Sequence, residues 1–296
     1  MVNEKMRFGA LEAGGTKMVL AVGNAVGEVY EQEEIPTEAP DVTVPHIIKW
    51  FADKSISTLG VGAFGPTGVN PASPSFGKIL ETPKLAWRNY DFLGALKGGL
   101  GIPVGYDTDV NVACLGEAMF GAGRGLDCLV YLTVGTGIGA GVMIDGRLLH
   151  GMLHPEAGHV LIERKAGDKA KSSCAYHDNC VEGLASGPAI ALRWGKPASE
   201  LADNADVWEL EAAYLSRALS TYVLCYSPQR IILGGGVMKQ QHLFPLIRSK
   251  LLTDLGGYIK TPEIANIESY VVPAGCEGKQ GILGCLTLAA RTTVAP

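Results

Sequence analysis

The sequence has no basic run and no long apolar segment. Its 296 residues carry a formal net charge of −5. An acidic chain of this kind is a poor partner for a nucleic-acid backbone, and it lacks the polybasic segment that holds a protein to an anionic membrane. The uncharged stretch from Cys128 to Ile144 is shorter than the roughly 20 residues of a membrane span, and four glycines interrupt it. We therefore expect neither a nucleic-acid partner nor a membrane.

The opening residues MVNEKMRFGALEAGG show no apolar core of a secretory signal and no small-residue cleavage site. The seven cysteines are odd in number, and together these two features argue against a disulfide framework. We expect a cytoplasmic protein whose thiols are reduced. Five of the cysteines have apolar neighbours, which is typical of small buried thiols. Cys174 and Cys180 instead lie in a polar segment.

Two common nucleotide-binding motifs are missing or misplaced. No Gly-Lys pair is followed by Ser or Thr, so there is no P-loop. The segment Gly60 to Gly65 matches the letters Gly-x-Gly-x-x-Gly of a dinucleotide site, but Pro66 and the turn residues after it do not open the long helix that such a site requires. A Gly-x-Ser-x-Gly hydrolase elbow is also absent. A nucleotide would have to be bound by other elements.

A repeat of strand, glycine turn and strand is the main sign of the architecture. It occurs at residues 7–23 and again at 128–144, which suggests a duplicated α/β fold. Asp206 and Glu209 have the spacing of a helix capping pair. Residues 70–90 are rich in Pro, Ser and Gly and predict an irregular segment. We expect helices at 44–54, 110–120, 182–194, 206–226, 242–252 and 281–291, and further strands at 59–64, 102–106, 230–233 and 270–273.

Glycine turns follow predicted strands at three places. Glycine lets the backbone approach a ligand closely and present its N–H groups to an anion. Each turn alone is as well explained by a tight hairpin. Three of them together favour a site for a nucleotide's phosphates and its nucleoside. These turns are Gly14-Gly15-Thr16-Lys17, Gly135-Thr136-Gly137 and Gly234-Gly235-Gly236.

The segment from Gly105 to Asn111 lies where a predicted strand gives way to a helix. A carboxylate at this place is near the positive end of the helix and can accept the proton of an attacking hydroxyl. The alternative is that Asp107 or Asp109 is only a helix N-cap. Asn111 suits a hydrogen bond to a sugar hydroxyl, or a plain place on the helix surface.

His159, Cys174, His177 and Cys180 have the spacing His-x14-Cys-x2-His-x2-Cys. Four such ligands match tetrahedral zinc, and a closed set of four predicts a structural ion rather than a catalytic one. A metal would also explain how the polar loop 159–180 is ordered. The alternative is a chance grouping of cysteines and histidines. Glu156 and Glu182 flank the cluster, either as solvated charges or as groups that the metal holds near a substrate.

Taken together, these segments resemble the ROK family of sugar kinases and regulators, over nearly the whole chain. Glu12 to Lys17 resembles the family's first phosphate motif, although many members have Asp in place of Glu12. Thr133 to Gly139 resembles the second phosphate motif, and Gly234-Gly235-Gly236 the adenosine motif. Thr108-Asp109-Val110-Asn111 resembles the Asn-Asp-x-Asn segment, with Thr108 in place of the usual Asn. The resemblance implies duplicated actin/hexokinase-like (ribonuclease H-like) domains on either side of a central cleft. The expected domains are 1–114 and 115–284, with a final helix at about 285–296 that packs back on the first.

The resemblance also assigns roles. Asp109 becomes the catalytic base, and the strand end at Gly65-Pro66 lies beside the sugar. Glu156, His159 and Glu182 contact the sugar, and His159 also holds zinc. Cys174, His177 and Cys180 resemble the fructokinase branch, whereas many family glucokinases have cysteines only.

These roles imply an ATP-dependent enzyme that uses Mg²⁺, carries structural Zn²⁺ and forms a homodimer. Fructose, phosphorylated to fructose 6-phosphate, is the preferred substrate. Glucose, mannose or another hexose is the closest rival. A non-catalytic sugar sensor and an actin-like nucleotide switch are more distant ones.

Overall fold

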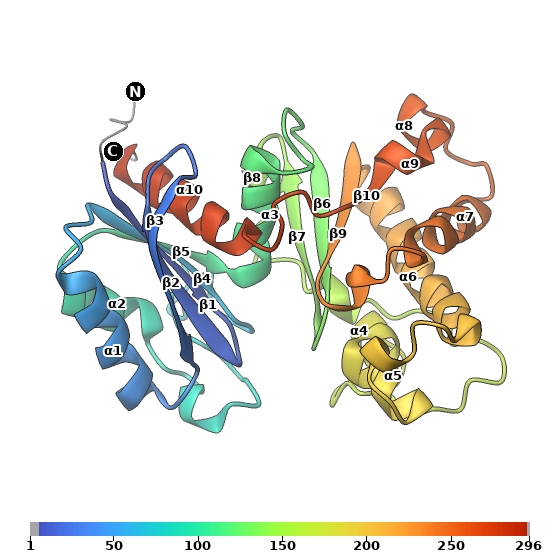
Figure 1. The fold of residues 1–296 in the computed structure, drawn as a ribbon, viewed down its shortest axis with the longest axis horizontal. Coiled ribbons are helices and arrows are strands. Elements are labelled where there is room, and N and C mark those ends of the chain that lie inside the picture. The colour runs from blue at the N-terminus through green and yellow to red at the C-terminus, as the bar shows by residue number, and fades with distance from the viewer. Residues whose placement is uncertain (1–5, 295–296) are drawn as a thin grey trace. The chain divides into compact units, whose positions relative to one another are not determined.

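Two five-stranded sheets organise residues 6–294, which the computed structural model describes (Figure 1). Each sheet belongs to its own compact unit. The first unit combines residues up to 124 with residues 148–155 and the segment from 276 onward, and the second holds residues 125–147 and 156–275. The domain limits 1–114 and 115–284 stay predictions. The predicted final helix is α10 (Gln280–Val294), and residues 295 and 296 of that prediction lie outside the described residues.

The first sheet has the strand order β3-β2-β1-β4-β5. β1 runs antiparallel to β2, and β2 antiparallel to β3, whereas β4 and β5 continue the sheet in parallel. The strands are β1 (Phe8–Ala13), β2 (Lys17–Gly23), β3 (Val29–Pro36), β4 (Thr58–Ala63) and β5 (Val104–Thr108).

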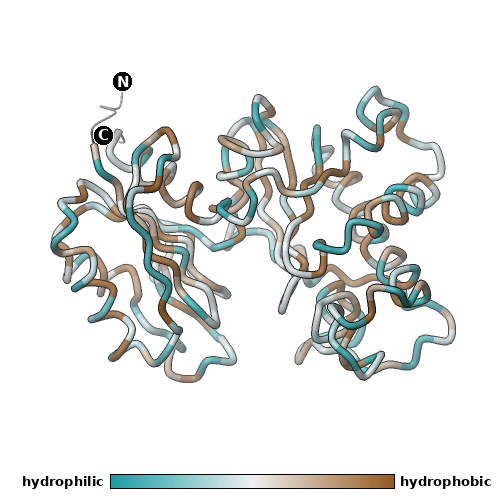
Figure 2. Tube along the Cα trace, in the orientation of Figure 1, coloured by the Kyte–Doolittle hydropathy of each residue, from teal (hydrophilic) through white to brown (hydrophobic). Residues whose placement is uncertain are grey.

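Alternating side chains bury both faces of this sheet. Leu11 and Leu20 belong to a core with α1 (Pro40–Ala52) and α2 (Phe92–Leu100). Phe8 and Ala10 belong to the opposite core, with α3 (Asp109–Phe120) and α10. Figure 2 shows hydrophobic residues along these strands. A sheet covered on both faces explains why most positions of its central strands are apolar.

The second sheet has the order β10-β9-β6-β7-β8. Read from its other edge, β8-β7-β6-β9-β10, it repeats the order β3-β2-β1-β4-β5 of the first sheet. The directions agree as well, since β6 pairs antiparallel with β7 and parallel with β9. This confirms the predicted duplication. The strands are β6 (Leu129–Val134), β7 (Ile138–Ile144), β8 (Arg147–Leu148), β9 (Arg230–Gly234) and β10 (Val271–Pro273).

The second unit also contains most of the remaining helices. The long helix α6 packs along α7 (Figure 1). The helices are α4 (Val181–Ala185), α5 (Gly187–Trp194), α6 (Ala205–Tyr226), α7 (Leu243–Leu255), α8 (Pro262–Ala265) and α9 (Ile267–Tyr270), and the short 3-10 turns of the chain are η1 (Leu85–Trp87), η2 (Ala157–His159), η3 (Ala198–Glu200) and η4 (Val237–Lys239). Among the described helices, none combines the length and the hydrophobicity that a membrane crossing requires.

Two glycines let α10 approach its neighbours in the first unit. A Cβ at Gly60 of β4 would lie 1.9 Å from the backbone oxygen of Cys285, and one at Gly284 would lie 1.7 Å from that of Val112 in α3. Both distances are far below contact, so only glycine permits this packing. The side-by-side helices α3 and α10 (Figure 1) are thereby fixed against the sheet. The start of α3, where Asp109 lies, is held by the same packing.

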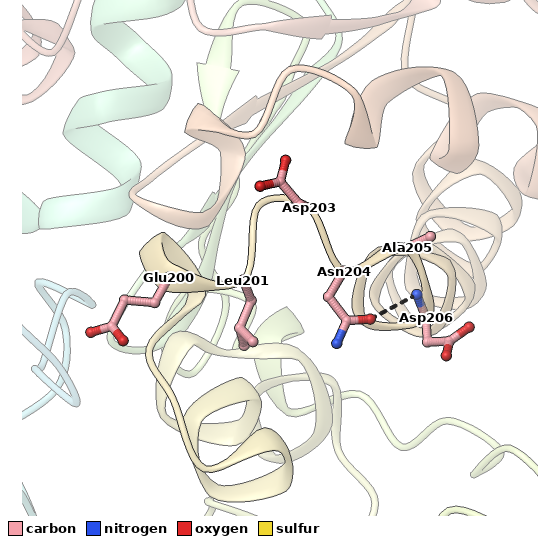
Figure 3. A pocket seen from close by; sticks show the side chains of 6 residues that line it. All are labelled: Glu200, Leu201, Asp203, Asn204, Ala205 and Asp206. Atoms are coloured by element: carbon pink, nitrogen blue, oxygen red, sulfur yellow. Dashed lines mark hydrogen bonds between the residues drawn. The ribbon is translucent and has the colours of Figure 1, made fainter.

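Two local predictions differ from the structure. The helix expected at 182–194 is two helices, because Ser186 is extended and caps α5 by accepting a hydrogen bond from the Ala189 N–H. The predicted capping pair of Asp206 and Glu209 is wrong: Asn204 caps α6, and its side chain accepts from the Asp206 N–H at 3.2 Å (Figure 3). Strand β3 and helix α2 were not expected.

Candidate active site and metal centre

The start of α3 carries Asp109 in the first unit. Thr108 is extended and caps this helix, since its hydroxyl oxygen accepts from the Asn111 N–H at 3.1 Å. The N-cap alternative for Asp107 and Asp109 is therefore excluded. The Asp109 carboxylate accepts from the Val110 N–H at 2.8 Å and lies at the positive end of the helix.

Glu12, in β1, belongs to the same group of acidic side chains. Its carboxyl lies over Gly281 of α10, so closely that a Cβ there would be 2.3 Å from the Glu12 Cδ. Burial, and next the charge of Asp109, raise the pKa of Glu12 to about 7, while Lys17 acts in the opposite direction. A buried carboxyl whose pKa is raised in this way, with a second carboxylate nearby, is typical of a functional site.

The first glycine turn joins β1 and β2. A Cβ at Gly14 would lie 2.7 Å from the Lys17 backbone oxygen, and the Thr37 hydroxyl donates to the Gly14 oxygen at 2.7 Å. Lys17 Nζ lies 2.6 Å from Glu34 Oε2, and this bond raises the Lys17 pKa. Thr16 and Lys17 are exposed at the turn. A phosphate that binds Lys17 has to compete with Glu34.

Gly65 and Pro66 follow the end of β4 and are joined by a cis peptide bond. The Leu80 N–H donates to the Pro66 oxygen at 2.8 Å, and the Phe64 N–H to the Ala13 oxygen at 2.7 Å. The first bond joins the predicted sugar-side segment to Leu80, and the second joins it to the end of β1. The structure thus brings this segment, the first glycine turn and the start of α3 into one unit.

The second and third glycine turns lie together in the second unit. The Gly135 N–H donates to the Gly137 oxygen at 2.9 Å, which closes the turn between β6 and β7. Gly235 has φ +91°, and a Cβ there would lie 2.4 Å from the Val134 oxygen. Gly236 N is 3.9 Å from the place of a Cβ on Gly135. The remaining predicted residues of this group, Thr133, Thr136 and Gly234, belong to the same strand ends and turns.

Glu182 lies against the second turn. Its Oε2 accepts from the Ile138 N–H at 3.0 Å, and a Cβ at Gly137 would come within 2.7 Å of the same oxygen. Gly158 is pressed on β7 as well, since a Cβ there would be 1.7 Å from the Ile138 oxygen. Glu156 is exposed and begins the turn η2, which ends at His159. Glu156, His159 and Glu182 therefore belong to one end of the second sheet.

The four predicted metal ligands converge. His159 Nδ1 is 3.8 Å from the Cys174 sulfur and 3.7 Å from the Cys180 sulfur, and His177 Nδ1 is 3.7 Å from the Cys174 sulfur. All four ligand atoms lie within 4.8 Å of one another. Zinc bonds of about 2.0 to 2.3 Å in a tetrahedron give ligand separations of about 3.3 to 3.8 Å, so the donor set fits this ion.

Backbone groups surround the two sulfurs. The Gly183 N–H donates to the Cys180 sulfur at 3.3 Å, and the Tyr176 N–H to the Cys174 sulfur at 3.4 Å. Such bonds favour thiolates and orient metal ligands. Without a cation, burial raises the Cys180 pKa to about 11, so a buried thiolate here needs a positive partner. His159 Nε2 is also 4.0 Å from Glu182 Oε1, which connects the cluster to the second glycine turn.

One pair near Asp109 was not expected from the sequence. His150 Nε2 lies 2.9 Å from Asp107 Oδ2, and Asp107 is almost fully buried. In the sequence, His150 stands beside Gly151 shortly before His154, and nothing in this local pattern connects it with Asp107.

The sequence profile of the ROK family matches residues 8–292. The chain belongs to the ROK family. A relative from Bacillus subtilis (strain 168), provisionally named a fructokinase, is 47% identical over 283 residues, which are 95% of each chain. The fructokinase of Pediococcus pentosaceus is 43% identical and is matched over 96% of this chain and 98% of its own.

A solved structure shows the same fold. The ROK hexokinase from Thermus thermophilus superposes with a TM-score of 0.79 at 24% identity, over 97% of this chain and 99% of that one. The predicted actin/hexokinase-like fold with duplicated α/β units is thus confirmed.

Proposed function

We propose that this ROK protein transfers the γ-phosphoryl group of ATP to the 6-hydroxyl of a hexose, with fructose as the preferred substrate. The observation that carries the proposal is the place of Asp109, at the start of a helix that Thr108 caps and beside the carboxyl of Glu12. The match to relatives named fructokinase over nearly the whole chain supports the reaction and the sugar.

The reaction needs one base and a charged cradle. Asp109 accepts the proton of the 6-hydroxyl while the oxygen of that hydroxyl forms a bond to the γ-phosphorus. The bond between that phosphorus and the β,γ-bridging oxygen breaks. ADP and the hexose 6-phosphate are the products. Mg²⁺ supplies positive charge that neutralises the phosphates. The rest of the catalysis comes from positioning and electrostatics rather than from covalent chemistry.

The glycine turns are our candidates for the nucleotide site. Gly14, Gly15, Thr16 and Lys17 would contact phosphate oxygens from the first unit, through backbone N–H groups and the Lys17 ammonium. From the second unit we propose Thr133, Gly135, Thr136 and Gly137 for the phosphates, and Gly234, Gly235 and Gly236 for the adenosine. The tight packing of Gly137 on Glu182 and of Gly235 on Val134 supports a rigid backbone there.

The sugar contacts are proposed from both units. In the first unit they are Gly65, Pro66 and Asn111, and in the second Glu156, His159 and Glu182. Carboxylates and amides suit this role, because they accept or donate hydrogen bonds to several hydroxyls at once. The bond between Glu182 and the Ile138 N–H supports a fixed orientation for one of these carboxylates.

We further propose that His159, Cys174, His177 and Cys180 bind one structural Zn²⁺. The ion would order a loop that buries little apolar surface and would hold His159 and Glu182 in place. Metal analysis of the purified protein tests this directly: about one zinc per chain is expected, and Cys174→Ser with Cys180→Ser should remove it. Protein free of zinc after mild purification would contradict the proposal.

A coupled assay that follows ADP formation tests the reaction. The wild type is offered fructose, glucose and mannose with ATP and Mg²⁺, and fructose should give the highest kcat/KM. Asp109→Asn should lower kcat by about 10² to 10⁴ while leaving the fold intact. Asp91→Asn is the matched control, because Asp91 also lies at the start of a helix of the first unit. It caps α2, where its Oδ1 accepts from the Gly94 N–H at 2.9 Å. Equal activity of the two variants would refute the role of Asp109.

Glucose is the rival substrate that an observation favours, since the similar fold of the Streptomyces griseus ROK glucokinase was solved with glucose and AMPPNP (TM-score 0.76, 24% identity). A clear preference for glucose in the panel would replace fructose. The homodimer is a separate proposal. Light scattering should give twice the 31.2 kDa of the chain, and a monomer would end it.

A further inference from the structure

A buried chain of polar contacts leads from His150 to Asn111 in the first unit. His150 Nε2 lies 2.9 Å from Asp107 Oδ2, and the other carboxylate oxygen, Oδ1, accepts from Asn111 Nδ2 at 2.7 Å. The Thr108 N–H also donates to Oδ1, at 2.8 Å. The carboxylate of Asp107 therefore uses each of its oxygens, one for the histidine and one for the amide.

These contacts decide which way the Asn111 amide faces. With its NH₂ group on Asp107, a flipped amide would place two acceptor oxygens 2.7 Å apart, which is strongly unfavourable. The amide oxygen Oδ1 is left over. It is buried and has no hydrogen-bond partner among the described residues, and Asn111 itself is 0% exposed. A buried acceptor without a partner is rare and calls for an explanation.

We propose that Asp107 and His150 are positioning residues that fix the amide of Asn111 with its oxygen ready to accept a hydrogen bond from one hydroxyl of the sugar. The inference rests on the proposed hexose kinase function. Asp109, the proposed base, begins the same helix. Asn111, which would hold the hydroxyl through Oδ1, follows it two positions later in α3. His150 acts through Asp107 and Asn111, since its Nε2 lies 2.9 Å from Asp107 Oδ2 and 3.4 Å from Asn111 Nδ2.

The ion pair suits this task. Asp107 is almost fully buried, whereas about a third of the His150 side chain is exposed. The hydrogen bond to Asp107 raises the pKa of His150, so the histidine stays positively charged over a wider pH range. Loss of His150 would leave a buried carboxylate with one oxygen unpaired, free to turn and to release the Asn111 amide.

Three substitutions of His150 test the inference. His150→Ala removes the donor. In His150→Gln the side-chain amide can reach Asp107 as Nε2 does, whereas the shorter His150→Asn cannot. We expect KM for fructose to rise in the Ala and Asn variants, with kcat/KM lower by roughly 10-fold or more, and the Gln variant to keep most of the wild-type value. Because the Gln and Asn variants are both polar, this pair remains informative if the Ala variant does not fold.

The matched control is His46→Ala. His46 Nε2 lies 2.9 Å from Glu33 Oε1, the same contact in the same unit but at an exposed site. Its kcat/KM should equal that of the wild type. A purely structural His150 would instead lower the melting temperature and leave the KM of the folded enzyme unchanged.

A double-mutant cycle separates action through Asn111 from an independent effect. In an Asn111→Ala background, His150→Ala should change kcat/KM by less than about 2-fold, because the oriented oxygen is already gone. Full additivity of the two losses, or a His150→Asn variant as active as His46→Ala, would overturn the inference. A wild type that phosphorylates no hexose would instead refute the proposed function, so the two failures are distinguishable.

Discussion

Glu12→Gln should change the free energy of unfolding, relative to the wild type, more favourably at pH 8 than at pH 4.5. The carboxyl of Glu12 is packed on Gly281 and lies near Asp109, and burial followed by the charge of Asp109 raises its pKa from 4.5 to about 7. Below pH 4.5 the group is protonated in both states and has no effect. Between pH 4.5 and 7 the unfolded chain loses the proton and the folded chain keeps it, so the folded state loses stability as the pH rises.

The magnitude follows from the size of this shift. Each pH unit between the two pKa values is worth about 1.4 kcal/mol, so the wild type loses roughly 3 kcal/mol of unfolding free energy between pH 4.5 and 8 through this group. Glutamine is uncharged at both pH values and escapes the loss. Any packing cost of the new side chain is the same at both pH values and cancels when the two differences are compared.

Urea unfolding of both proteins at the two pH values measures the effect. The control is Glu163→Gln, whose side chain is 85% exposed and which should gain nothing with pH. The reasoning would be refuted if Glu12→Gln changed the free energy of unfolding, relative to the wild type, by the same amount at pH 8 and at pH 4.5. Such a result would mean that Glu12 ionises in the folded protein as easily as in the unfolded chain.

Three further predictions concern the metal loop, a helix cap and a glycine contact. Treatment with a zinc chelator, or Cys174→Ser, should expose residues 159–180 to limited proteolysis while the first unit stays resistant, and unchanged cleavage would count against a structural ion. Asn204→Ala should cost about 1 kcal/mol and lower Tm by roughly 2 °C, whereas Asn204→Asp keeps the cap and should keep Tm. Gly60→Ala should destabilise by about 3 kcal/mol, because its Cβ would meet the Cys285 oxygen at 1.9 Å, and a wild-type Tm would show that the contact relaxes.

Features with short-range signals could be predicted from the sequence. The repeated strand, glycine turn and strand gave the duplicated architecture, since both copies pair antiparallel. The grouping of His159, Cys174, His177 and Cys180 was predicted because three of the four residues lie within seven positions of one another and only His159 is distant. These signals depend on spacing, which folding preserves.

Features that depend on a pairing partner, or on a choice between neighbouring caps, could not be predicted. Strand β3 is polar and rich in glutamate, and it is a strand because it pairs with β2 at the edge of the sheet. The cap at Asn204 lies two residues before the first member of the expected pair, and helix α6 begins at Ala205 rather than at Asp206. His150 reaches Asp107 across 43 positions of sequence. For β3 and His150 the partner decides the outcome, whereas at the start of α6 both Asn204 and Asp206 are residue types that cap helices.

The central claim is that Asp109 serves a hexose kinase. The most direct measurement is the kcat/KM for ATP-dependent phosphorylation of fructose, glucose and mannose by the wild type and by Asp109→Asn. The account predicts hexose 6-phosphate as product, the highest value for fructose and a kcat reduced by about 10² to 10⁴ in the variant. Absence of transfer to every hexose, or near wild-type turnover by Asp109→Asn, would contradict it.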